Sequence, residues 1–256
     1  MIDDVKSYYN SSGWINKKIK EHINGNERVD KCLNFFKTFI TENQSVKDVL
    51  EIGCSIGLTT VELAKSYPKI KFTGLDIANN QIEFAKNNFN LFNADFICAD
   101  ITDNGINKKF DLITLFDIYE HIKLDSRKKF NLALSHLLSH SGSLIITCPS
   151  WIISKRNQQD KPELLQVVDE VVTIEDYIKL ADDIGGTLTY LKLISVWESF
   201  DYCHCIISKE SPLKVMKNAR RKISLLERLK IKLGISERQL RIKNRRDILK
   251  SMKIEN

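Results

Sequence analysis

The sequence lacks any apolar run long enough to cross a bilayer. Its longest apolar stretches, Leu112–Phe116 and Leu144–Ile146, have the length of β-strands, whereas a membrane-spanning helix needs about 20 apolar residues. The first residues, Met1–Lys6, also lack the apolar core that follows the basic start of a signal peptide. We therefore expect a cytoplasmic protein, peripheral at most to the inner face of the membrane.

The cysteines do not form a recognisable framework of disulfides or metal ligands. The six cysteines are scattered along the chain, several of them in strand-like runs, which is typical of free thiols that pack as small hydrophobic side chains. Cys203-His204-Cys205 lacks the second ligand pair of a structural zinc site. On a strand, His204 would also point away from the two cysteines. We predict ordinary strand packing there.

The chain has no internal repeats and no low-complexity tract, but its charge is unevenly distributed. The net charge is +6, and residues 211–256 carry 15 Lys and Arg against 4 Asp and Glu, a balance of +11. The other 210 residues therefore carry −5. A mildly acidic body and a strongly basic tail indicate two parts with different roles.

Short β-branched runs alternate with helix-period segments between residues 46 and 208. The predicted strands are 47–52, 71–75, 95–98, 110–115, 143–148, 188–196 and 202–208, and the predicted helices between them are 57–66, 79–89, 125–139 and 173–184. This alternation predicts a mostly parallel sheet with helices on both faces. The short link Glu198–Asp201 permits only an antiparallel pairing of the last two strands.

The predicted fold class is therefore α/β, with a Rossmann-like sheet of seven strands whose last strand is antiparallel. We expect three parts: a helical cap over residues 1–45, the sheet domain over 46–208, and a basic amphipathic helical tail over 209–256. In the tail, apolar residues recur along one helical stripe: Met216, Ala219, Ile223, Leu226, Leu229 and Leu233.

A glycine-containing turn follows the first predicted strand and opens a helix. Gly53 and Gly57 let the backbone pass close to a ligand, and helix N-terminal amides then point toward it. The next strands end in Asp76 and Asp100, and Phe116-Asp117 ends the fourth. Ligands of open α/β sheets bind beyond the carboxyl ends of the strands. A carboxylate at Asp76 could accept the hydroxyls of a ribose.

Residues 45–208 resemble the class I S-adenosylmethionine-dependent methyltransferase family, with Glu51-x-Gly53-Cys54-Ser55-x-Gly57 as its glycine-rich first motif. The resemblance implies S-adenosylmethionine as the cofactor. It assigns these residues to the cofactor site: Glu51, Gly53, Cys54, Ser55, Gly57, Asp76, Ile77, Gln81, Asp100, Ile101 and Phe116. The turn would wrap the methionine part, Asp76 would bind the ribose, and Asp100-Ile101 would contact the adenine. Ser55 stands where the family most often has a glycine.

The segment Asp117-Ile118-Tyr119-Glu120-His121 is similar to the acid-x-x-Glu-His segment of the ubiquinone-biosynthesis O-methyltransferases. That similarity makes Asp117, Glu120 and His121 candidate catalytic residues and candidate ligands of a divalent metal such as Mg²⁺. The spacing i, i+3, i+4 would cluster them on one side of a turn, where a metal could lower the pKa of an acceptor hydroxyl. Alternatively, His121 acts alone as a general base, or the segment is structural.

The sequence identifies the acceptor pocket less clearly than the cofactor site. Methyl transfer mainly requires that a nucleophile be held in line with the methyl group and that water be excluded, and neither needs a fixed motif. Candidate pocket residues are the aromatics Tyr8, Tyr9, Trp14 and Trp151 and the stretch 149–172. We predict O-methylation of a small molecule or a surface-glycan precursor, as in bacterial cofactor and surface-polysaccharide pathways. This prediction rests on analogy with the family.

Three other functions share parts of this pattern. A nucleic-acid methyltransferase would usually carry prolines where this chain has Asp117–Glu120, and an acidic body repels phosphates. An NAD-dependent oxidoreductase would have a glycine at the position of Leu58. A non-catalytic binding module could retain the same fold. The basic tail could contact an anionic membrane or a partner protein, or its stripe could pack on the body or on a second subunit in a homodimer.

Overall fold

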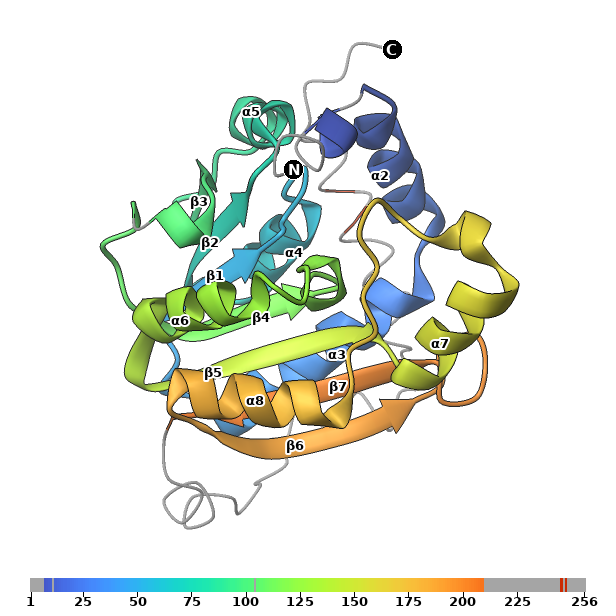
Figure 1. Cartoon of the computed structure of the whole chain (residues 1–256). Helices are drawn as coiled ribbons and strands as arrows, with labels where there is room; N and C mark the ends of the chain where they lie inside the picture. The colour runs from blue at the N-terminus through green and yellow to red at the C-terminus, as the bar shows by residue number, and fades with distance from the viewer. Residues whose placement is uncertain (1–6, 11, 104, 210–244, 246, 248–256) are drawn as a thin grey trace, which may run out of the picture.

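The computed structural model describes residues 7–10, 12–103, 105–209, 245 and 247, and these form a single seven-stranded sheet with helices on both faces (Figure 1). The strands are β1 Asp48–Ile52, β2 Lys71–Asp76, β3 Ala94–Cys98, β4 Phe110–Phe116, β5 Leu138–Pro149, β6 Thr187–Ile194 and β7 Tyr202–Ser208. The α-helices are α2 Ser12–Asn24, α3 Glu27–Glu42, α4 Leu58–Ser66, α5 Asn79–Asn88, α6 Arg127–Leu137, α7 Trp151–Asp160 and α8 Ile174–Ile184. Short 3-10 turns are η1 Ile101–Asp103, η2 Tyr119–His121 and η3 Pro162–Leu164.

The strand order is β3-β2-β1-β4-β5-β7-β6. Strands β1 to β5 pair in parallel, and β7 pairs antiparallel with both β5 and β6. The predicted fold class is confirmed, including the antiparallel last strand. In space β7 lies between β5 and β6, so β6 forms the edge of the sheet.

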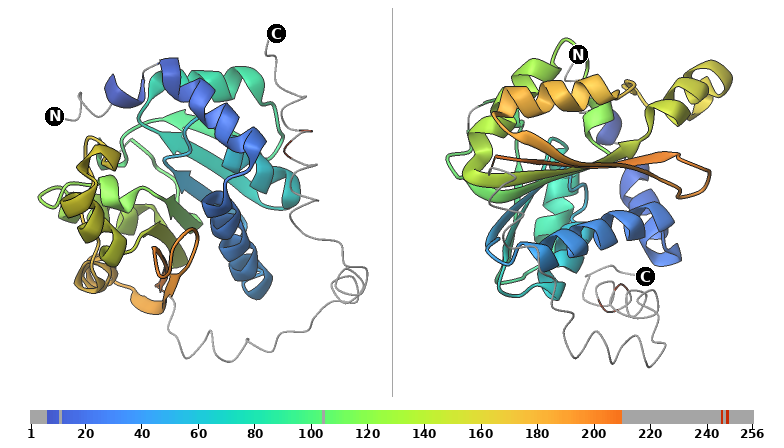
Figure 2. Two further views of the ribbon diagram at one scale, coloured as in Figure 1. Left: turned by 90° about the vertical axis from the view of Figure 1, so that its right-hand side faces the viewer. Right: turned by 90° about the horizontal axis from the view of Figure 1, so that it is seen from below.

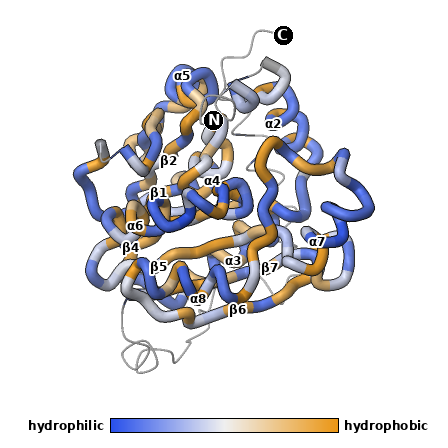
Figure 3. Tube along the Cα trace, in the orientation of Figure 1, coloured by the Kyte–Doolittle hydropathy of each residue, from blue (hydrophilic) through white to orange (hydrophobic). Residues whose placement is uncertain are grey.

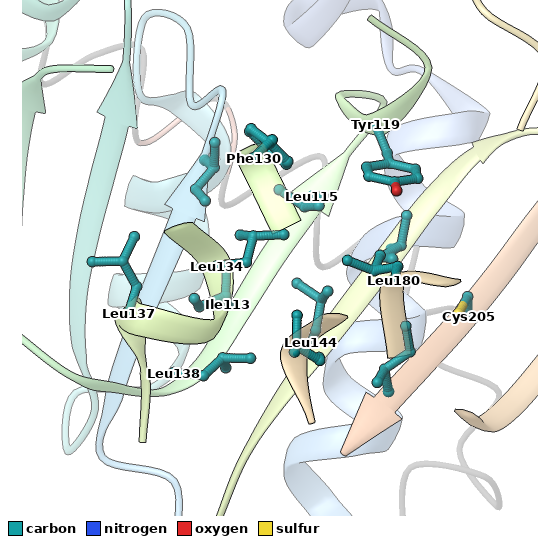
Figure 4. Packing of buried hydrophobic residues seen from close by; sticks show 14 of the residues in the cluster. Ile113, Leu115, Tyr119, Phe130, Leu134, Leu137, Leu138, Leu144, Leu180 and Cys205 are labelled. Carbon is teal, nitrogen blue, oxygen red and sulfur yellow. The ribbon is translucent and has the colours of Figure 1, made fainter. Parts of the chain in front are cut away.

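The central strands are buried on both faces because their successive residues point to opposite sides. Val49 belongs to the cluster under α3 and α4, and its neighbour Leu50 belongs to the cluster under α6 and α8. In Figure 4, Leu134 of α6 and Leu180 of α8 lie over Ile113 and Leu144 of the sheet. Figure 3 shows β5 as a hydrophobic strand through the middle of the molecule.

Helix α8 shows how local sequence fixes the element boundaries. Its N-cap Thr173 and Asp176 form a capping box, and the helix ends at Gly185 in the left-handed conformation. The predicted helices agree with α4, α5, α6 and α8 to within two residues at each end. Two features differ from the prediction: β5 begins earlier, at Leu138, and α7 follows β5.

The cysteine prediction is confirmed. All six thiols are free, and only Cys98 is exposed. On β7, Cys203 and Cys205 belong to the cluster under α6 and α8, whereas the His204 ring stacks on Phe35 of α3 on the other face, with 4.4 Å between centroids. The CHC run is therefore part of the strand packing.

Helices α2 and α3 form the amino-terminal part, and α3 packs on the sheet through buried residues such as Phe36 (Figure 1). In the part of the chain that the structure describes, no helix has the length and hydropathy needed to span a membrane. The predicted tail helix lies outside the described residues, apart from Arg245 and Asp247.

Candidate active site

A cavity of about 530 Å³ opens at the carboxyl ends of β1, β2 and β4. Its lining includes all of the predicted cofactor residues except Gly57: Glu51, Gly53, Cys54, Ser55, Asp76, Ile77, Gln81, Asp100, Ile101 and Phe116. Gly57 lies just behind the wall and is the N-cap of α4. The topology therefore brings residues from four strand ends to one hollow, as expected for ligand sites of α/β sheets.

The glycine-rich turn needs its glycines for two reasons. Gly53 and Gly57 have φ values of +76° and +80°, which side-chain-bearing residues rarely adopt. A Cβ on Gly53 would collide with the Ile118 side chain, and one on Gly57 would lie 2.5 Å from the Phe96 ring. The turn is thus packed tightly against the side chains around it. Ser55, in the same turn, also has a positive φ, of 51°.

Glu51 is buried at the end of β1 and accepts a hydrogen bond from the Thr60 hydroxyl of α4. Burial raises the pKa of Glu51 to about 7. The nearby Asp76 carboxylate contributes to this rise, whereas the hydrogen bond from Thr60 opposes it. The same hydrogen bond ties the strand before the turn to the helix after it.

Asp76 holds the turn in place from the end of β2. Its carboxylate accepts hydrogen bonds from the backbone amides of Ser55 at 2.8 Å and Ala78 at 2.9 Å. Burial raises the pKa of Asp76, and these backbone hydrogen bonds oppose that shift. The Ile77 amide also bonds to this carboxylate, and because a carboxylate has about four acceptor positions, it can still accept from a ligand in the cavity.

Residues at the ends of β3 and β4 also line the cavity. Asp100 accepts a hydrogen bond from the Thr102 amide at 2.8 Å and lines the cavity beside Ile101, the buried first residue of η1. Phe116, the last residue of β4, is partly buried. Asp100 and Ile101, the residues predicted to contact the adenine, thus line the same cavity as Asp76.

The segment before α2 covers part of the cavity. The Tyr9 carbonyl accepts a hydrogen bond from the Gln81 side chain, and Asn10 is bonded to Asn80. The Tyr9 hydroxyl donates to Gln166 at 2.8 Å. Of the four aromatic candidates, Tyr9 and Trp14 line the cavity, whereas Tyr8 and Trp151 do not.

The Asp117 carboxylate forms an ion pair of its own, separate from the contacts of His121. The Asp117 backbone is left-handed, with φ of 55°, and the partner of the carboxylate is Arg28 in the first turn of α3. Sequence reasoning missed Arg28, because nothing in its local pattern distinguishes it from the other cations of the amino-terminal part. Its contact with Asp117 comes from the packing of α3.

His121 is engaged at both ring nitrogens. Nδ1 lies 2.9 Å from an Asp169 carboxylate oxygen and 2.6 Å from the Val168 carbonyl, and Nε2 lies 3.2 Å from the Gln166 amide nitrogen. Burial alone would lower its pKa, but the carboxylates of Glu120 and Asp169 and the Val168 carbonyl outweigh it and raise the pKa to about 9. Glu120 is itself buried, which raises the pKa of its carboxyl.

The metal-site hypothesis for Asp117, Glu120 and His121 is therefore corrected. Within the described ranges, no group of three or more His, Cys, Asp and Glu side chains is placed to hold a metal ion. Asp117 is paired with Arg28, and His121 faces Asp169 rather than an open coordination position. The i, i+3, i+4 spacing failed because η2 is a short 3-10 turn with a left-handed residue before it.

Known proteins share both this sequence pattern and this fold. The profile of a family described as "Methyltransferase domain" matches residues 49–142. A malonyl-(acyl-carrier protein) O-methyltransferase of Acetivibrio thermocellus is 38% identical over 72 residues, which cover 28% of this chain and 25% of that protein. Another, of Ilyobacter polytropus, is 25% identical over 164 residues, covering 63% and 59%. The matches thus span from a quarter to under two thirds of these relatives' lengths.

Among solved structures, the magnesium protoporphyrin IX methyltransferase of Synechocystis PCC 6803 matches with a TM-score of 0.65 at 15% identity, covering 82% of this chain and all of that one. An S-adenosylmethionine-dependent methyltransferase of Clostridium acetobutylicum matches with a TM-score of 0.54 at 20% identity, covering 68% and 89%. The fold is that of the class I methyltransferases. Residues 49–142 thus resemble a methyltransferase domain in sequence, and the sheet shares the fold of the class I methyltransferases.

Proposed function

We propose that this chain uses S-adenosylmethionine to methylate an oxygen atom of a small-molecule acceptor. Precursors of surface glycans are among the acceptors that we propose. One observation carries the proposal: the cavity at the strand ends is lined by Asp76, Asp100 and the glycine-rich turn of a methyltransferase domain. Its volume of about 530 Å³ falls in the range of small-molecule sites.

The residues around the cavity fit the cofactor. Asp76 would accept the ribose hydroxyls with the lone pairs that the amides of Ser55 and Ala78 leave free. Asp100 and Ile101 would hold the adenine ring, and the turn after Gly53 would lie against the methionine part. When bound, S-adenosylmethionine supplies an electrophilic methyl group on its sulfonium.

The chain's own contribution is to position the acceptor and exclude water. Tyr9, Trp14, Arg28, His121 and Gln166 line the cavity together with the cofactor residues, and they come from the amino-terminal part, η2 and the segment after α7. The contacts of Tyr9 with Gln81 and Gln166 close this side of the cavity. Such closure favours transfer to the acceptor because it keeps the acceptor in line and keeps water away from the methyl group.

We assign His121 a positioning role rather than that of a general base. A histidine with a pKa near 9 is protonated at pH 7, so it cannot accept a proton from an acceptor hydroxyl. Its contacts with Asp169 and Gln166 instead hold the segment between α7 and α8 against the cavity. With the Arg28 guanidinium, it would also provide positive charge beside a negatively charged acceptor oxygen.

The curated relatives and the charge of the chain support an oxygen acceptor on a small molecule. The relatives named above are O-methyltransferases. Residues 1–210 carry a net charge of −5, which disfavours the binding of a polyphosphate such as RNA or DNA to the body.

The experiment is an acceptor screen that measures S-adenosylhomocysteine release. We expect turnover with members of a panel of carboxylic acids, sugars and phenols. The Arg28→Gln variant should be slower, with Lys37→Gln, a cation of α3 that does not line the cavity, as the matched control. Turnover with amines alone would contradict the oxygen assignment. Retardation of RNA or DNA at moderate salt, together with methylation of it, would favour a nucleic-acid acceptor.

A further inference from the structure

An ion pair between Arg28 and Asp117 forms part of the cavity wall. Asp117 follows β4, and Arg28 belongs to the first turn of α3, which lies across the face of the sheet opposite α8 (Figure 2). The two side chains are only 18% and 13% exposed. Because a largely buried ion pair has lost much of its hydration, the hydrogen-bonding groups that it leaves over need other partners.

One oxygen of the Asp117 carboxylate has no such partner. Among the described residues, Oδ2 pairs with Arg28, whereas Oδ1 is buried and accepts no hydrogen bond. The Asp117 backbone is left-handed, with φ of 55°, and its amide donates to the Thr147 carbonyl at 2.8 Å. Buried side-chain oxygens are usually hydrogen-bonded, and enforced left-handed residues cluster at ligand sites. Together these features indicate that a ligand supplies a hydrogen-bond donor to Oδ1.

Arg28 offers the complementary groups. A guanidinium has five N–H donors, and in the described part of the chain the side chain of Arg28 pairs with Asp117 alone. The first turn of a helix is also an unfavourable place for a cation, because the free amides there carry partial positive charge. An anionic group of a ligand beside Arg28 would use the remaining donors and offset this repulsion.

The ion pair lies beside the glycine-rich turn. Strands β1 and β4 are neighbours, with Ile52 opposite Leu115. The chain therefore leaves β1 at Gly53 next to the point where it leaves β4 at Asp117. The Ile118 side chain also fills the space in which a Cβ on Gly53 would lie. A ligand group that lies against the turn is thus placed to reach the ion pair.

We propose that Arg28 and Asp117 together bind the charged α-amino acid end of S-adenosylmethionine, an assignment that rests on the proposed cofactor. That end carries a carboxylate and an ammonium group on one carbon atom. The carboxylate would accept from the Arg28 N–H groups, and the ammonium group would donate to Asp117 Oδ1. Both hydrogen bonds are charge-assisted, which makes them about twice as strong as neutral ones. The remaining N–H groups of Arg28 stay available to an acceptor oxygen that approaches the methyl group.

A methyl acceptor alone explains the unpaired oxygen less well. An ionised carboxylate only accepts hydrogen bonds. A negatively charged acceptor oxygen has no hydrogen to donate, and Asp117 would repel it. The ammonium group has three N–H donors and a positive charge. The Asp76 carboxylate, which holds the same turn through the Ser55 amide, adds negative charge on this side of the cavity and further favours a cationic group there.

The test compares S-adenosylhomocysteine with methylthioadenosine, which keeps the adenosine and the sulfur but lacks the α-amino acid end, in calorimetric titrations of the full chain. We expect the wild type to prefer S-adenosylhomocysteine. Arg28→Gln and Asp117→Asn should each bind it at least about tenfold more weakly, the effect of one charge-assisted hydrogen bond, and should bind methylthioadenosine like the wild type. The matched control is Asp125→Asn, which removes an exposed carboxylate that lines the same cavity and should retain both affinities.

A double variant separates loss of the ligand contact from loss of folding. Either single substitution leaves one charge of the pair without its partner, which is costly in a buried position. Arg28→Gln/Asp117→Asn removes both charges. It should therefore bind methylthioadenosine like the wild type and still lose the preference for S-adenosylhomocysteine.

Three results would overturn the assignment and leave the proposed cofactor standing. The first is a wild type that binds the two compounds equally well. The second is an equal loss of affinity for both compounds in the double variant, which would make the pair a general support of the cavity. The third is unchanged binding of S-adenosylhomocysteine with a raised KM for the acceptor, which would assign the pair to the acceptor. Failure of the wild type to bind either compound would overturn the proposed cofactor and this assignment with it.

Discussion

Tyr9 and Gln166 are separated by 157 positions in the sequence, yet the Tyr9 hydroxyl donates a 2.8 Å hydrogen bond to the Gln166 side chain. Both residues line the cavity. Gln166 also lies 3.2 Å from His121 Nε2, and His121 Nδ1 lies 2.9 Å from Asp169. A chain of polar contacts thus runs from the amino-terminal segment to the segment between α7 and α8.

Removal of the Tyr9 hydroxyl should loosen this closure. We expect Tyr9→Phe to raise the dissociation constant for S-adenosylhomocysteine about three- to tenfold, the size of effect that one hydrogen bond gives. Calorimetric titration measures it. The matched control is Tyr8→Phe, because Tyr8 does not line the cavity. Equal affinities in all three proteins would show that the Tyr9 contact does not stabilise the bound state.

The glycine-rich turn can be tested by a pair of substitutions at positive φ. Gly53→Ala adds both left-handed strain and a collision with Ile118, whereas Gly185→Ala adds only strain because nothing lies within 4 Å of its Cβ. We expect Gly185→Ala to lower the free energy of unfolding by about 1 kcal/mol. Gly53→Ala should lower it further and abolish S-adenosylhomocysteine binding. Urea denaturation measures the stability, and equal losses in the two variants would contradict the packing of the turn.

The buried Glu51 predicts a pH dependence of stability. Its pKa is raised from 4.5 to about 7 by burial, so the folded state binds a proton more tightly than the unfolded state does. The stabilising contribution is full below pH 4.5 and is lost as the pH rises through about 7. Relative to Glu51→Gln, the wild type should lose stability between pH 4.5 and 7.5 in urea denaturation. A constant difference across that range would contradict a raised pKa.

His121 should titrate well above an ordinary histidine. Its pKa of about 9 means that it stabilises the fold fully below pH 6.5 and loses that contribution as the pH rises through 9. Asp169→Asn should lower its midpoint in an NMR titration, because it removes a carboxylate 2.9 Å from Nδ1. The control is Asp160→Asn, at the exposed end of α7. A midpoint near 6.5 that Asp169→Asn leaves unchanged would refute this account.

The titration of His121 is linked to the orientation of Gln166. A charged imidazole donates from both nitrogens, so it pairs with Gln166 when the amide presents its oxygen to Nε2 and its nitrogen to Tyr9. A neutral ring bonded to Asp169 through Nδ1–H accepts from the amide nitrogen instead, and this is the orientation in the structure, where the Tyr9 hydroxyl donates to the Gln166 oxygen. Deprotonation would therefore reverse the direction of the Tyr9–Gln166 hydrogen bond, and we expect the affinity for S-adenosylhomocysteine to change around the His121 pKa.

Much of the fold was predictable because its signals are local. Val49–Ile52 in the first strand are all buried, and the turn at Gly53 and Gly57 requires positive φ. The order of β7 and β6 was not predictable, since a short link fixes their pairing but not which of them joins β5. Helix α7 was missed because none of its residues is buried, so the apolar periodicity that marks the other helices is absent.

The part of the cavity at the strand ends was predictable and the part lined by α3 and the segment after α7 was not, for the same physical reason. Asp76 and Asp100 follow strands whose carboxyl ends must meet at one edge of the sheet. Arg28, Gln166 and Asp169 reach the cavity only through the packing of α3 and of the segment after α7. Arg245, which forms ion pairs with Asp30 and Glu62 and lines the cavity, was likewise beyond any local pattern.

The most direct test of the central claim is calorimetric titration with S-adenosylhomocysteine and, separately, with NAD. We predict micromolar binding of S-adenosylhomocysteine and no binding of NAD. Asp76→Ala should abolish that binding because it removes the ribose acceptor and the anchor of the Ser55 amide, whereas Asp95→Ala, an exposed acid on β3, should bind normally. Binding of NAD alone, or undiminished binding by Asp76→Ala, would contradict the account.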